Sequence, residues 1–414
     1  MERTLWASLL VMLCISLLSG CQLFGTRSPA VKQQEVSSEP SETVSVFSDP
    51  IELQIKEMTL TEKIGQLVII GIDGTSFDSP METMIDTYKV GGFILFKRNI
   101  MDTNQALLLI SELKSYNSMN PFPLFVSVDE EGGRVTRMPD GFLAVPSSWE
   151  IGLVDDEELA QNIGSATARK IKAFGFNMNF APVLDIHSNQ QNPVIGDRSF
   201  GTSPETVSRL GIATMNGMKS ENVIPVVKHF PGHGDTSIDS HLDLPVLNHT
   251  KERLDSFEIK PFQQAIREGA DVVMVAHILL PKIDAQHPAS LSKPIMTDIL
   301  RQQLQFDGVI ITDDLTMGAI TETYEISDAA VQSIHAGSDI VLIGHEYERQ
   351  VAVLHSLKQA AIDGTIPIEA IDDKVYRILK LKQKYQLADD TLNNKVDIDR
   401  INTDLHGVLN PFLK

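Results

Sequence analysis

The stretch from residue 228 to residue 241, KHFPGHGDTSIDSH, contains one lysine, three histidines and two aspartates within fourteen positions. Its glycines and its proline interrupt any regular helix or strand, so we expect these polar side chains on an irregular loop. Loops that are held by a rigid scaffold are where catalytic groups tend to collect. The sequence therefore predicts that this loop carries the chemistry of the protein.

Asp239 and His241 form the first candidate pair in this loop. The carboxylate can accept a proton from one imidazole nitrogen while the other nitrogen faces a substrate, which is an arrangement for acid–base catalysis. Histidine suits this role because its ordinary pKa of about 6.5 lets it exchange a proton near neutral pH. A metal site is the alternative, although no HExxH-like helix accompanies it. Its ligands would be His233, Asp235, Asp239 and His241.

A further acidic residue, Asp313, ends the apolar run VIITD of residues 309–313. A carboxylate at a strand end can act as a nucleophile or an electrostatic stabiliser if it shares a face with the loop of Asp239. A lone aspartate at such a position more often caps a helix, and Asp314 beside it is the better candidate for that role. Asp313 becomes a candidate catalytic residue because we expect it to lie on the same face as Asp239.

Charged residues in three other segments could hold a polar ligand. Asp129 and Arg137 lie at the two ends of DEEGGRVTR, whose glycine pair permits a sharp turn, and could grip hydroxyl or amide groups. We expect three further residues to reach the same ligand site: Arg198 from IGDRSFG, and Lys228 and His229 from the start of the stretch 228–241. The alternative for these residues is a structural network of ion pairs.

Short apolar runs rich in Val, Ile and Phe alternate with longer amphipathic segments from residue 60 onward. This alternation indicates a parallel sheet that is buried on both faces, and eight such runs favour a closed (β/α)₈ barrel of the TIM type. The predicted strands are 64–72, 90–96, 123–129, 177–185, 223–229, 271–277, 309–313 and 339–344. The predicted helices include 102–117, 157–174, 204–221, 251–268, 293–305, 325–336 and 368–385.

Polar residues stand at the carboxyl ends of the predicted strands. In a barrel these ends form one face, and that face carries the active site. An open α/β sheet would also bind its ligand there, so the position of the site is a firmer prediction than closure of the barrel. The residues concerned are Asp129, Asp185, Lys228, His229, His277 and Asp313.

The composition is that of a globular protein, with 414 residues, 42% of them hydrophobic, and a net charge of −20. Such acidity argues against nucleic acid and against electrostatic adsorption to an anionic membrane. We expect a single catalytic domain over residues 51–388, followed by a C-terminal tail at 389–414. The sequence gives no indication of whether the protein has a protein partner.

Residues 1–20 carry an arginine, an apolar run and then small residues before Cys21, which is the layout of a secretory signal. The ending LSGC resembles the bacterial lipobox, where cleavage precedes a cysteine that is then lipidated; an ordinary signal or an uncleaved anchor is the alternative. Residues 21–50, rich in Ser, Glu and Pro, predict a flexible tether. We therefore expect an exported protein, anchored by lipid at Cys21 to the extracytoplasmic face of a bacterial membrane. It would have no disulfide.

The motifs VDEEGGRVTR, GDRSFG, KHFPGHGDTSIDSH and VIITDDLTM occur in this order within residues 55–385. Together they resemble the bacterial β-N-acetylglucosaminidases (β-hexosaminidases) of glycoside hydrolase family 3. The resemblance implies a (β/α)₈ barrel that removes terminal, non-reducing β-linked N-acetylglucosamine from cell-wall fragments with retention of configuration. No cofactor and no resident metal are expected. Some relatives use a carboxylate acid/base from a second domain, and a His/Asp pair on the barrel's own loop would replace it.

The same resemblance implies the role of each candidate residue. Asp313 would be the nucleophile, and His241, oriented by Asp239, would be the acid/base in a double displacement. The residues implied to hold the hydroxyl groups and the N-acetyl group of the sugar are Asp129, Arg137, Arg198, Lys228 and His229.

Two other functions remain open from the sequence. One is a glycoside phosphorylase, because a histidine acid/base would not repel an anionic phosphate acceptor as a glutamate would. The other is a non-catalytic, sugar-binding lipoprotein, against which the intact set of Asp239, His241 and Asp313 argues.

Overall fold

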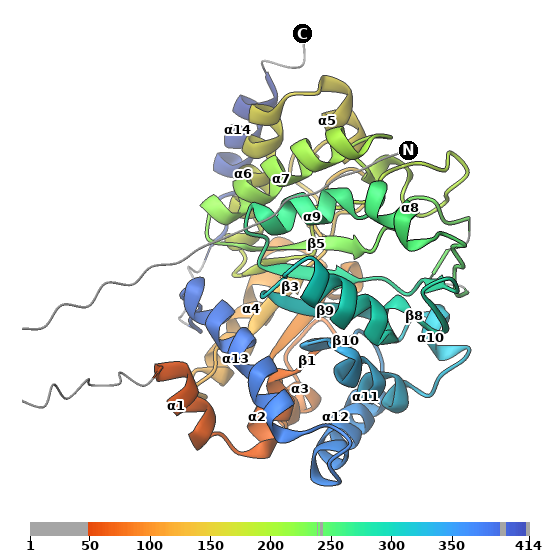
Figure 1. Cartoon of the computed structure of the whole chain (residues 1–414). Helices are drawn as coiled ribbons and strands as arrows, with labels where there is room; N and C mark the ends of the chain where they lie inside the picture. The colour runs from red at the N-terminus through yellow and green to blue at the C-terminus, as the bar shows by residue number, and fades with distance from the viewer. Residues whose placement is uncertain (1–48, 238, 241–242, 390–394, 411–414) are drawn as a thin grey trace, which may run out of the picture. The chain divides into compact units, whose positions relative to one another are not determined.

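Eight strands of the described residues close into a parallel barrel at the centre of Figure 1, which confirms the predicted (β/α)₈ fold class. The computed structural model describes residues 49–237, 239–240, 243–389 and 395–410. The barrel strands are β1 (Val68–Gly71), β2 (Gly92–Leu95), β3 (Phe125–Val128), β4 (Met178–Asn179), β5 (Ile224–Phe230), β6 (Val272–Val275), β9 (Val309–Asp314) and β10 (Ile340–Ile343). Strand β1 pairs with both β2 and β10 and so closes the ring.

Helices follow the strands and surround the barrel (Figure 1). They begin where polar side chains satisfy free backbone N–H groups: the Asp102 carboxylate accepts from Asn104 N and Gln105 N, both at 2.9 Å. The α-helices are α1 (Pro50–Glu57), α2 (Leu60–Gln66), α3 (Ser79–Asp86), α4 (Thr103–Asn117), α5 (Ser148–Val154), α6 (Glu157–Lys172), α7 (Pro204–Ser220), α8 (Lys251–Ser256), α9 (Lys260–Arg267), α10 (Gly318–Thr321), α11 (Ile326–Ala336), α12 (Tyr347–Ile362), α13 (Ile368–Lys384) and α14 (Ile398–Leu409).

Shorter elements complete the description. A two-stranded antiparallel hairpin, β7 (Leu279–Leu280) and β8 (Asp284–Pro288), follows β6. Three 3₁₀ turns and a π-helix lie between the larger elements: η1 (Lys97–Asn99), η2 (Gly196–Arg198), η3 (Ala289–Leu291) and the π-helix η4 (Pro294–Gln303).

Three of the predicted elements differ from the structure. The predicted strand 64–72 begins too early, because Thr59 and Glu62 form a capping box that starts helix α2. The predicted strand 177–185 is reduced to the two residues of β4 and one isolated bridge at Val183. The predicted helix 251–268 is broken at Phe257 into α8 and α9.

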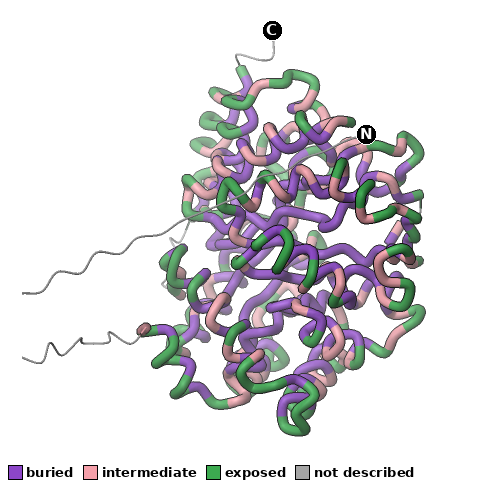
Figure 2. The backbone as a smooth tube through the Cα atoms, viewed as in Figure 1, coloured by how far each residue is buried: buried purple, intermediate pink, exposed green. Residues whose placement is uncertain are grey.

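Burial explains why the barrel strands are apolar along their whole length. The tube in Figure 2 is buried through the central strands, while the helices are exposed on their outer faces. Side chains inside the barrel and between barrel and helices form the core. Among the described residues, no helix is long and apolar enough to cross a membrane.

The segment predicted as a tail contains helix α14, whose Leu405 and Leu409 are buried in the same core cluster as residues of α6. Asn402 of this helix fastens the loop between β3 and α5. Its Nδ2 donates to Gly141 O at 2.8 Å, and its Oδ1 accepts from Leu143 N at 2.7 Å. The predicted signal, most of the predicted tether and Cys21 lie outside the described residues.

Candidate active site

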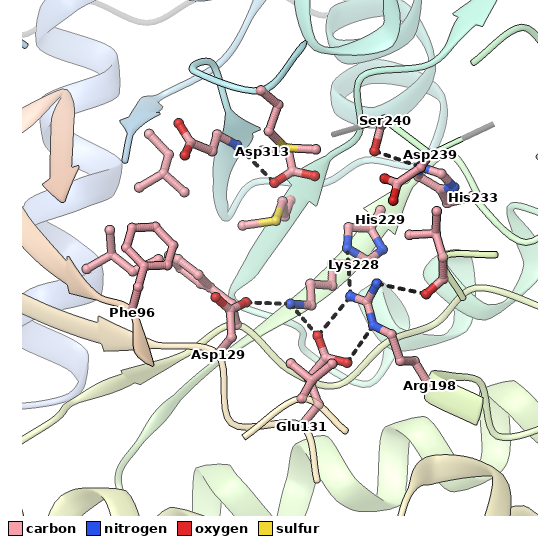
Figure 3. Close-up of a pocket in the computed structure, with 18 of the residues that line it drawn as sticks. Phe96, Asp129, Glu131, Arg198, Lys228, His229, His233, Asp239, Ser240 and Asp313 are labelled. Carbon is pink, nitrogen blue, oxygen red and sulfur yellow. Dashed lines mark hydrogen bonds and ion pairs between the residues drawn. The ribbon is translucent and has the colours of Figure 1, made fainter. Parts of the chain in front are cut away.

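A cavity of about 500 Å³ opens at the carboxyl ends of the barrel strands (Figure 3). The sequence analysis named eight site residues, and seven of them line this one cavity. The eighth, His241, lies outside the described residues. The seven lining residues are Asp129, Arg137, Arg198, Lys228, His229, Asp239 and Asp313.

A chain of ion pairs runs along one wall of the pocket (Figure 3). Lys228 Nζ lies 2.7 Å from Asp129 Oδ1 and 2.7 Å from Glu131 Oε1. Arg198 donates from Nε and Nη2 to the two oxygens of Glu131, at 2.8 and 2.9 Å. This two-pronged contact fixes the plane of the guanidinium as well as its position. The wall therefore offers fixed donors and acceptors to a polar ligand.

Glu131 is the residue of this wall that the sequence analysis did not assign. Its side chain is 2% exposed. Burial raises the pKa of Glu131, but Arg198 and Lys228 more than offset this and hold it well below its ordinary value. Burial also lowers the pKa of Lys228, yet Asp129 and Glu131 raise it above its ordinary value. The charges on this wall therefore keep one another ionised, and Glu131 positions two of the predicted binding residues.

The turn before Arg137 depends on two glycines. Gly132 and Gly133 have φ angles of 95° and 54°. A Cβ atom on Gly132 would lie 2.4 Å from Pro146 O, and one on Gly133 would lie 2.7 Å from Ser147 Cβ. Only glycine fits such positions without displacing its neighbours. The sharp turn expected from the glycine pair is present.

Arg137 lines the pocket and is held only loosely by contacts within the protein. Its Nη2 lies 3.7 Å from Asp129 Oδ2, and its buried Nε has no hydrogen-bond partner among the described residues. Its backbone N donates to Glu130 Oε2 at 2.8 Å. Glu130 is fully buried and pairs with Lys170 at 2.6 Å, so it supports the loop from behind.

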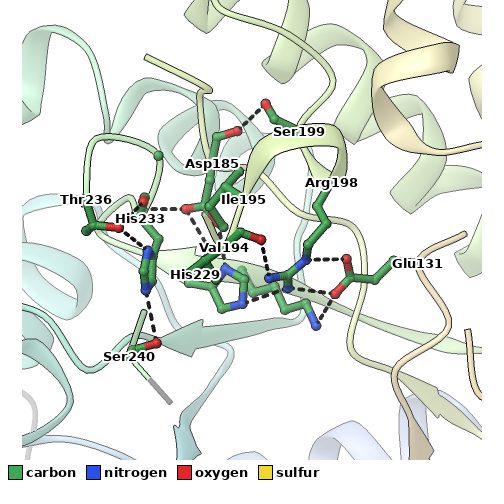
Figure 4. A network of polar contacts seen from close by, with 12 residues as sticks. Glu131, Asp185, Val194, Ile195, Arg198, Ser199, His229, His233, Thr236 and Ser240 are labelled. Carbon is green, nitrogen blue, oxygen red and sulfur yellow. Dashed lines mark hydrogen bonds and ion pairs between the residues drawn. The ribbon is translucent and has the colours of Figure 1, made fainter. Parts of the chain in front are cut away.

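Asp185 contacts both His229, near the end of β5, and His233, in the loop that follows (Figure 4). Asp185 is fully buried, and its Oδ2 lies 2.6 Å from His229 Nδ1. Its Oδ1 accepts from His233 N at 2.7 Å. Burial raises the pKa of Asp185, but His229 and His233 together more than offset this, so the pKa lies below its ordinary value. The sequence analysis placed Asp185 at a strand end without giving it a role.

His233 is a buried residue whose side chain contacts two other residues of the same loop. Thr236 Oγ1 lies 2.8 Å from its Nδ1, and Ser240 Oγ lies 3.2 Å from its Nε2. Burial lowers the pKa of His233 to about 4. Both ring nitrogens are engaged, which argues against His233 as a ligand in the alternative metal site. Instead it supports Ser240, the residue next to Asp239.

Asp313 reaches the pocket from the end of β9. Its Oδ1 accepts from Asp314 N at 2.9 Å. Burial raises the pKa of Asp313, but His229, His277 and Lys228 together hold it at about 2. Asp313 is therefore an anion at neutral pH.

Asp314 has a structural role, but it is not the predicted helix cap, because it is the last residue of β9 and helix α10 begins after Met317. Its Oδ1 accepts from Thr316 N at 2.9 Å and from Gly344 N at 2.8 Å, which ties the end of β9 to the end of β10. The β9 end is also tied to the β5 loop, because Ala319 N donates to Ser240 O at 3.1 Å. The loop of Asp239 is thus joined to helix α10, which follows the strand of Asp313.

The rest of the pocket wall is less charged. Phe96 and His345 stack with ring centroids 5.2 Å apart and an interplanar angle of 14°. Apolar side chains of Met274, Met317 and Leu342 line the pocket as well. A polar ring with an apolar face could contact both walls at once. The periodicity of the sequence gave no signal for these residues.

The family model that describes the glycosyl hydrolase family 3 N-terminal domain matches residues 59–381. The chain belongs to glycosyl hydrolase family 3. It is a glycoside hydrolase, and its curated relatives are named as β-hexosaminidases. Beta-hexosaminidase A of Pseudoalteromonas piscicida is 32% identical over 351 residues, which cover 77% of this chain and 59% of that relative. Beta-hexosaminidase of Thiobacillus denitrificans is 36% identical over 309 residues, covering 73% of this chain and 84% of the relative.

Solved structures of this family share the fold. The glycoside hydrolase family 3 β-N-acetylglucosaminidase from Paenibacillus sp. str. FPU-7 has a TM-score of 0.81 and 41% sequence identity, covering 85% of this chain and 68% of that chain. The family resemblance stated from the four motifs is thereby confirmed.

Proposed function

We propose that this family 3 enzyme is a retaining exo-β-N-acetylglucosaminidase, with Asp313 as its nucleophile. The observation that carries the proposal is the state of Asp313, which is ionised and lines the pocket that also holds the predicted sugar-binding residues. A nucleophile must be unprotonated in the resting enzyme. The names of the relatives support the choice of an N-acetylhexosamine as the sugar.

In the first step of the proposed reaction, a carboxylate oxygen of Asp313 forms a bond to the anomeric carbon. The bond from that carbon to the leaving oxygen breaks, and the imidazolium of His241 gives its proton to that oxygen. Asp239, which lines the pocket, is proposed to hold the imidazole in the correct orientation. The product of this step is a glycosyl ester of Asp313.

In the second step, neutral His241 removes a proton from water. The water oxygen bonds to the anomeric carbon, the ester bond to Asp313 breaks, and His241 regains its proton. Two displacements at the same carbon retain the configuration. General acid–base assistance of this kind is worth about 10²–10⁴ in rate.

The ion-paired wall supports recognition of the sugar. Asp129, Glu131 and Arg198 are held in place by their own contacts, so binding does not have to order them. Arg137 lines the pocket with a side chain that is 26% exposed, and it adds the N–H donors of its guanidinium. We propose that these groups bind the hydroxyl groups and the N-acetyl group of the terminal residue.

The first experiment compares the β-N-acetylglucosaminide and the β-glucoside of the same phenol. We expect a preference of at least tenfold in kcat/KM for the acetamido sugar and a β-configured first product by NMR. Equal rates on both sugars would overturn the substrate assignment, and an α-configured first product would overturn double displacement. The reaction is repeated with phosphate, because a sugar phosphate product would show a phosphorylase instead.

We further propose that the physiological substrates are peptidoglycan fragments, in which N-acetylglucosamine is β-linked to a muramic acid residue. Purified disaccharide fragments with and without a peptide stem provide the test. Release of N-acetylglucosamine from these fragments is expected. Activity restricted to chitin-derived oligosaccharides would argue against a cell-wall role.

The proposed location is the outer face of the cytoplasmic membrane or another extracytoplasmic membrane surface. The support is the LSGC motif at residues 18–21, which lies outside the described part of the chain. A labelled fatty acid supplied to the cells should be incorporated into the wild-type protein and not into the C21A variant. Membrane-bound wild-type protein without label would reject lipidation as the anchor.

A further inference from the structure

A second cluster of potential ligands lies beside the active-site loop. Asp235 comes from the loop after β5, His249 precedes α8, and Glu258 lies between α8 and α9. One ligand atom from each residue lies within 4.8 Å of the other two. None of the three lines the substrate pocket.

The imidazole of His249 points at both carboxylates. Its Nε2 lies 3.0 Å from Asp235 Oδ2 and 3.7 Å from Glu258 Oε1. This nitrogen is inaccessible to solvent and makes no properly aligned hydrogen bond with any described residue. In the tautomer that leaves Nε2 unprotonated, the lone pair of this nitrogen faces two carboxylates and is repelled by them. A cation at the centre of the three groups removes this repulsion and satisfies the buried nitrogen.

The spacing of the three ligand atoms suits a small metal ion. Zinc binds nitrogen and carboxylate oxygen at about 2.0–2.2 Å in tetrahedral geometry, which places neighbouring ligand atoms about 3.3 Å apart. The two distances from His249 Nε2, 3.0 and 3.7 Å, lie on either side of this value. We propose that Asp235, His249 and Glu258 bind a divalent transition metal of the zinc class, with water as the remaining ligand.

The neighbouring charges are compatible with a dication. Arg253 donates to Glu258 Oε1 from Nη2 at 2.8 Å and from Nε at 3.1 Å. Two carboxylates and one guanidinium sum to a charge of −1 around a neutral imidazole. The side chain of Glu258 is 3% exposed. The two hydrogen bonds from the Arg253 guanidinium fix the orientation of the Glu258 carboxylate. A carboxylate has enough lone pairs to serve both Arg253 and a metal.

The metal would brace the catalytic loop. Asp235 precedes Asp239 by four residues, whereas His249 and Glu258 belong to the segments that flank α8. A shared metal ion therefore ties the part of the loop next to Asp239 to a neighbouring helical layer. It acts on loop order and contributes no atom to the reaction.

The test uses the purified full chain after treatment with a chelator and its removal. Zinc chloride is then titrated by calorimetry, and thermal unfolding is followed with and without zinc. We expect one zinc ion per chain and a rise of a few degrees in the unfolding midpoint. In H249A and D235N we expect zinc affinity to fall more than about tenfold, and the midpoint to respond little to zinc.

The H241A variant is the matched control, because it removes the histidine of the catalytic pair and leaves this cluster intact. Zinc binding should survive in H241A. Loss of binding in H241A with retention in H249A would place the metal at the catalytic pair and overturn the proposal, as would wild-type protein that binds no zinc at micromolar concentration. If H249A does not fold, D235N decides, because the side chain of Asp235 is 31% exposed.

Discussion

Asp185 Oδ2 lies 2.6 Å from Nδ1 of His229, and this contact leaves His229 Nε2 facing Arg198 Nη2 at 3.4 Å (Figure 4). Because one nitrogen of the imidazole is bound by a carboxylate, the orientation of the ring is fixed and its other nitrogen faces the pocket. Asp185 itself does not line the pocket. It therefore acts on a ligand through His229.

The D185N variant tests this relationship. Asparagine keeps one acceptor for the backbone N–H groups of the loop but loses the charged contact with His229. We expect KM to rise about 10–100-fold, with a smaller effect on kcat. The control is D155N, because the side chain of Asp155 is 58% exposed. Unchanged KM in D185N would show that His229 needs no support from this carboxylate.

The D313N variant tests the proposed nucleophile. Its kcat/KM should fall by on the order of 10⁴-fold, because no carboxylate is left to form the glycosyl ester. Asp314 provides the contrast, since D314N disturbs the contacts to Thr316 and Gly344 and should lower the unfolding midpoint. In D313G, added azide should restore turnover and yield the α-glycosyl azide. A β-azide product would exclude Asp313 as the nucleophile.

His233 predicts a specific dependence of stability on pH. Its pKa in the folded protein is about 4, below the ordinary 6.5, so the folded state favours the neutral imidazole. Above pH 6.5 both states are neutral, and as pH falls to 4 the unfolded chain takes up the proton first. The free energy of unfolding should therefore drop by about 3 kcal/mol over this window.

The measurement compares wild-type protein with H233Q by denaturant unfolding at several pH values between 7.5 and 4. Glutamine can still bond to Thr236 and Ser240 but does not titrate. The stability difference between the two proteins should shrink as pH falls. A difference that stays constant would mean that burial of the neutral imidazole does not contribute to the loss of stability at low pH.

The pair of Glu130 and Lys170 predicts a large effect on stability. Their side chains are 0% and 4% exposed, and Nζ lies 2.6 Å from Oε1. K170M leaves a buried carboxylate without its cation and should cost about 3–5 kcal/mol. In the double variant E130Q/K170M most of this loss should be recovered. Equal losses in the single and double variants would show that the pair is not energetically coupled.

Arg137 should affect binding more than stability. Because its Nε has no partner among the described residues, R137A removes few internal contacts. We expect KM to rise at least tenfold while the unfolding midpoint changes little. A lower midpoint with normal KM would assign Arg137 to the support of Asp129 instead.

Much of this architecture could be predicted from the sequence. Apolar runs that are buried on both sides identify barrel strands, and helix caps such as Asp102 fix helix starts. The error at 64–72 arose because the apolar residues of α2 continue into β1 without a break in composition. The strand at 177–185 was overextended because the apolar residues after β4 are buried without pairing as a regular strand.

The site was predictable where side chains follow strand ends, as at Asp129, Lys228 and Asp313. Glu131 and Asp185 received no role because their importance lies in contacts across 67 and 44 residues of sequence, to Arg198 and His229. Contacts between residues so far apart in the sequence cannot be inferred from composition or spacing. The assignment of His241 stays a prediction, since that residue lies outside the described part of the chain.

Asn402 fastens the loop between β3 and α5 through contacts that span 259 and 261 residues of sequence. Asp129 and Arg137 belong to this loop, and its attachment to Asn402 comes from helix α14. A polypeptide that leaves a ribosome or crosses a membrane emerges with its N-terminus first. The two contacts of Asn402 can therefore form only after α14 has emerged, long after the loop itself has been synthesised.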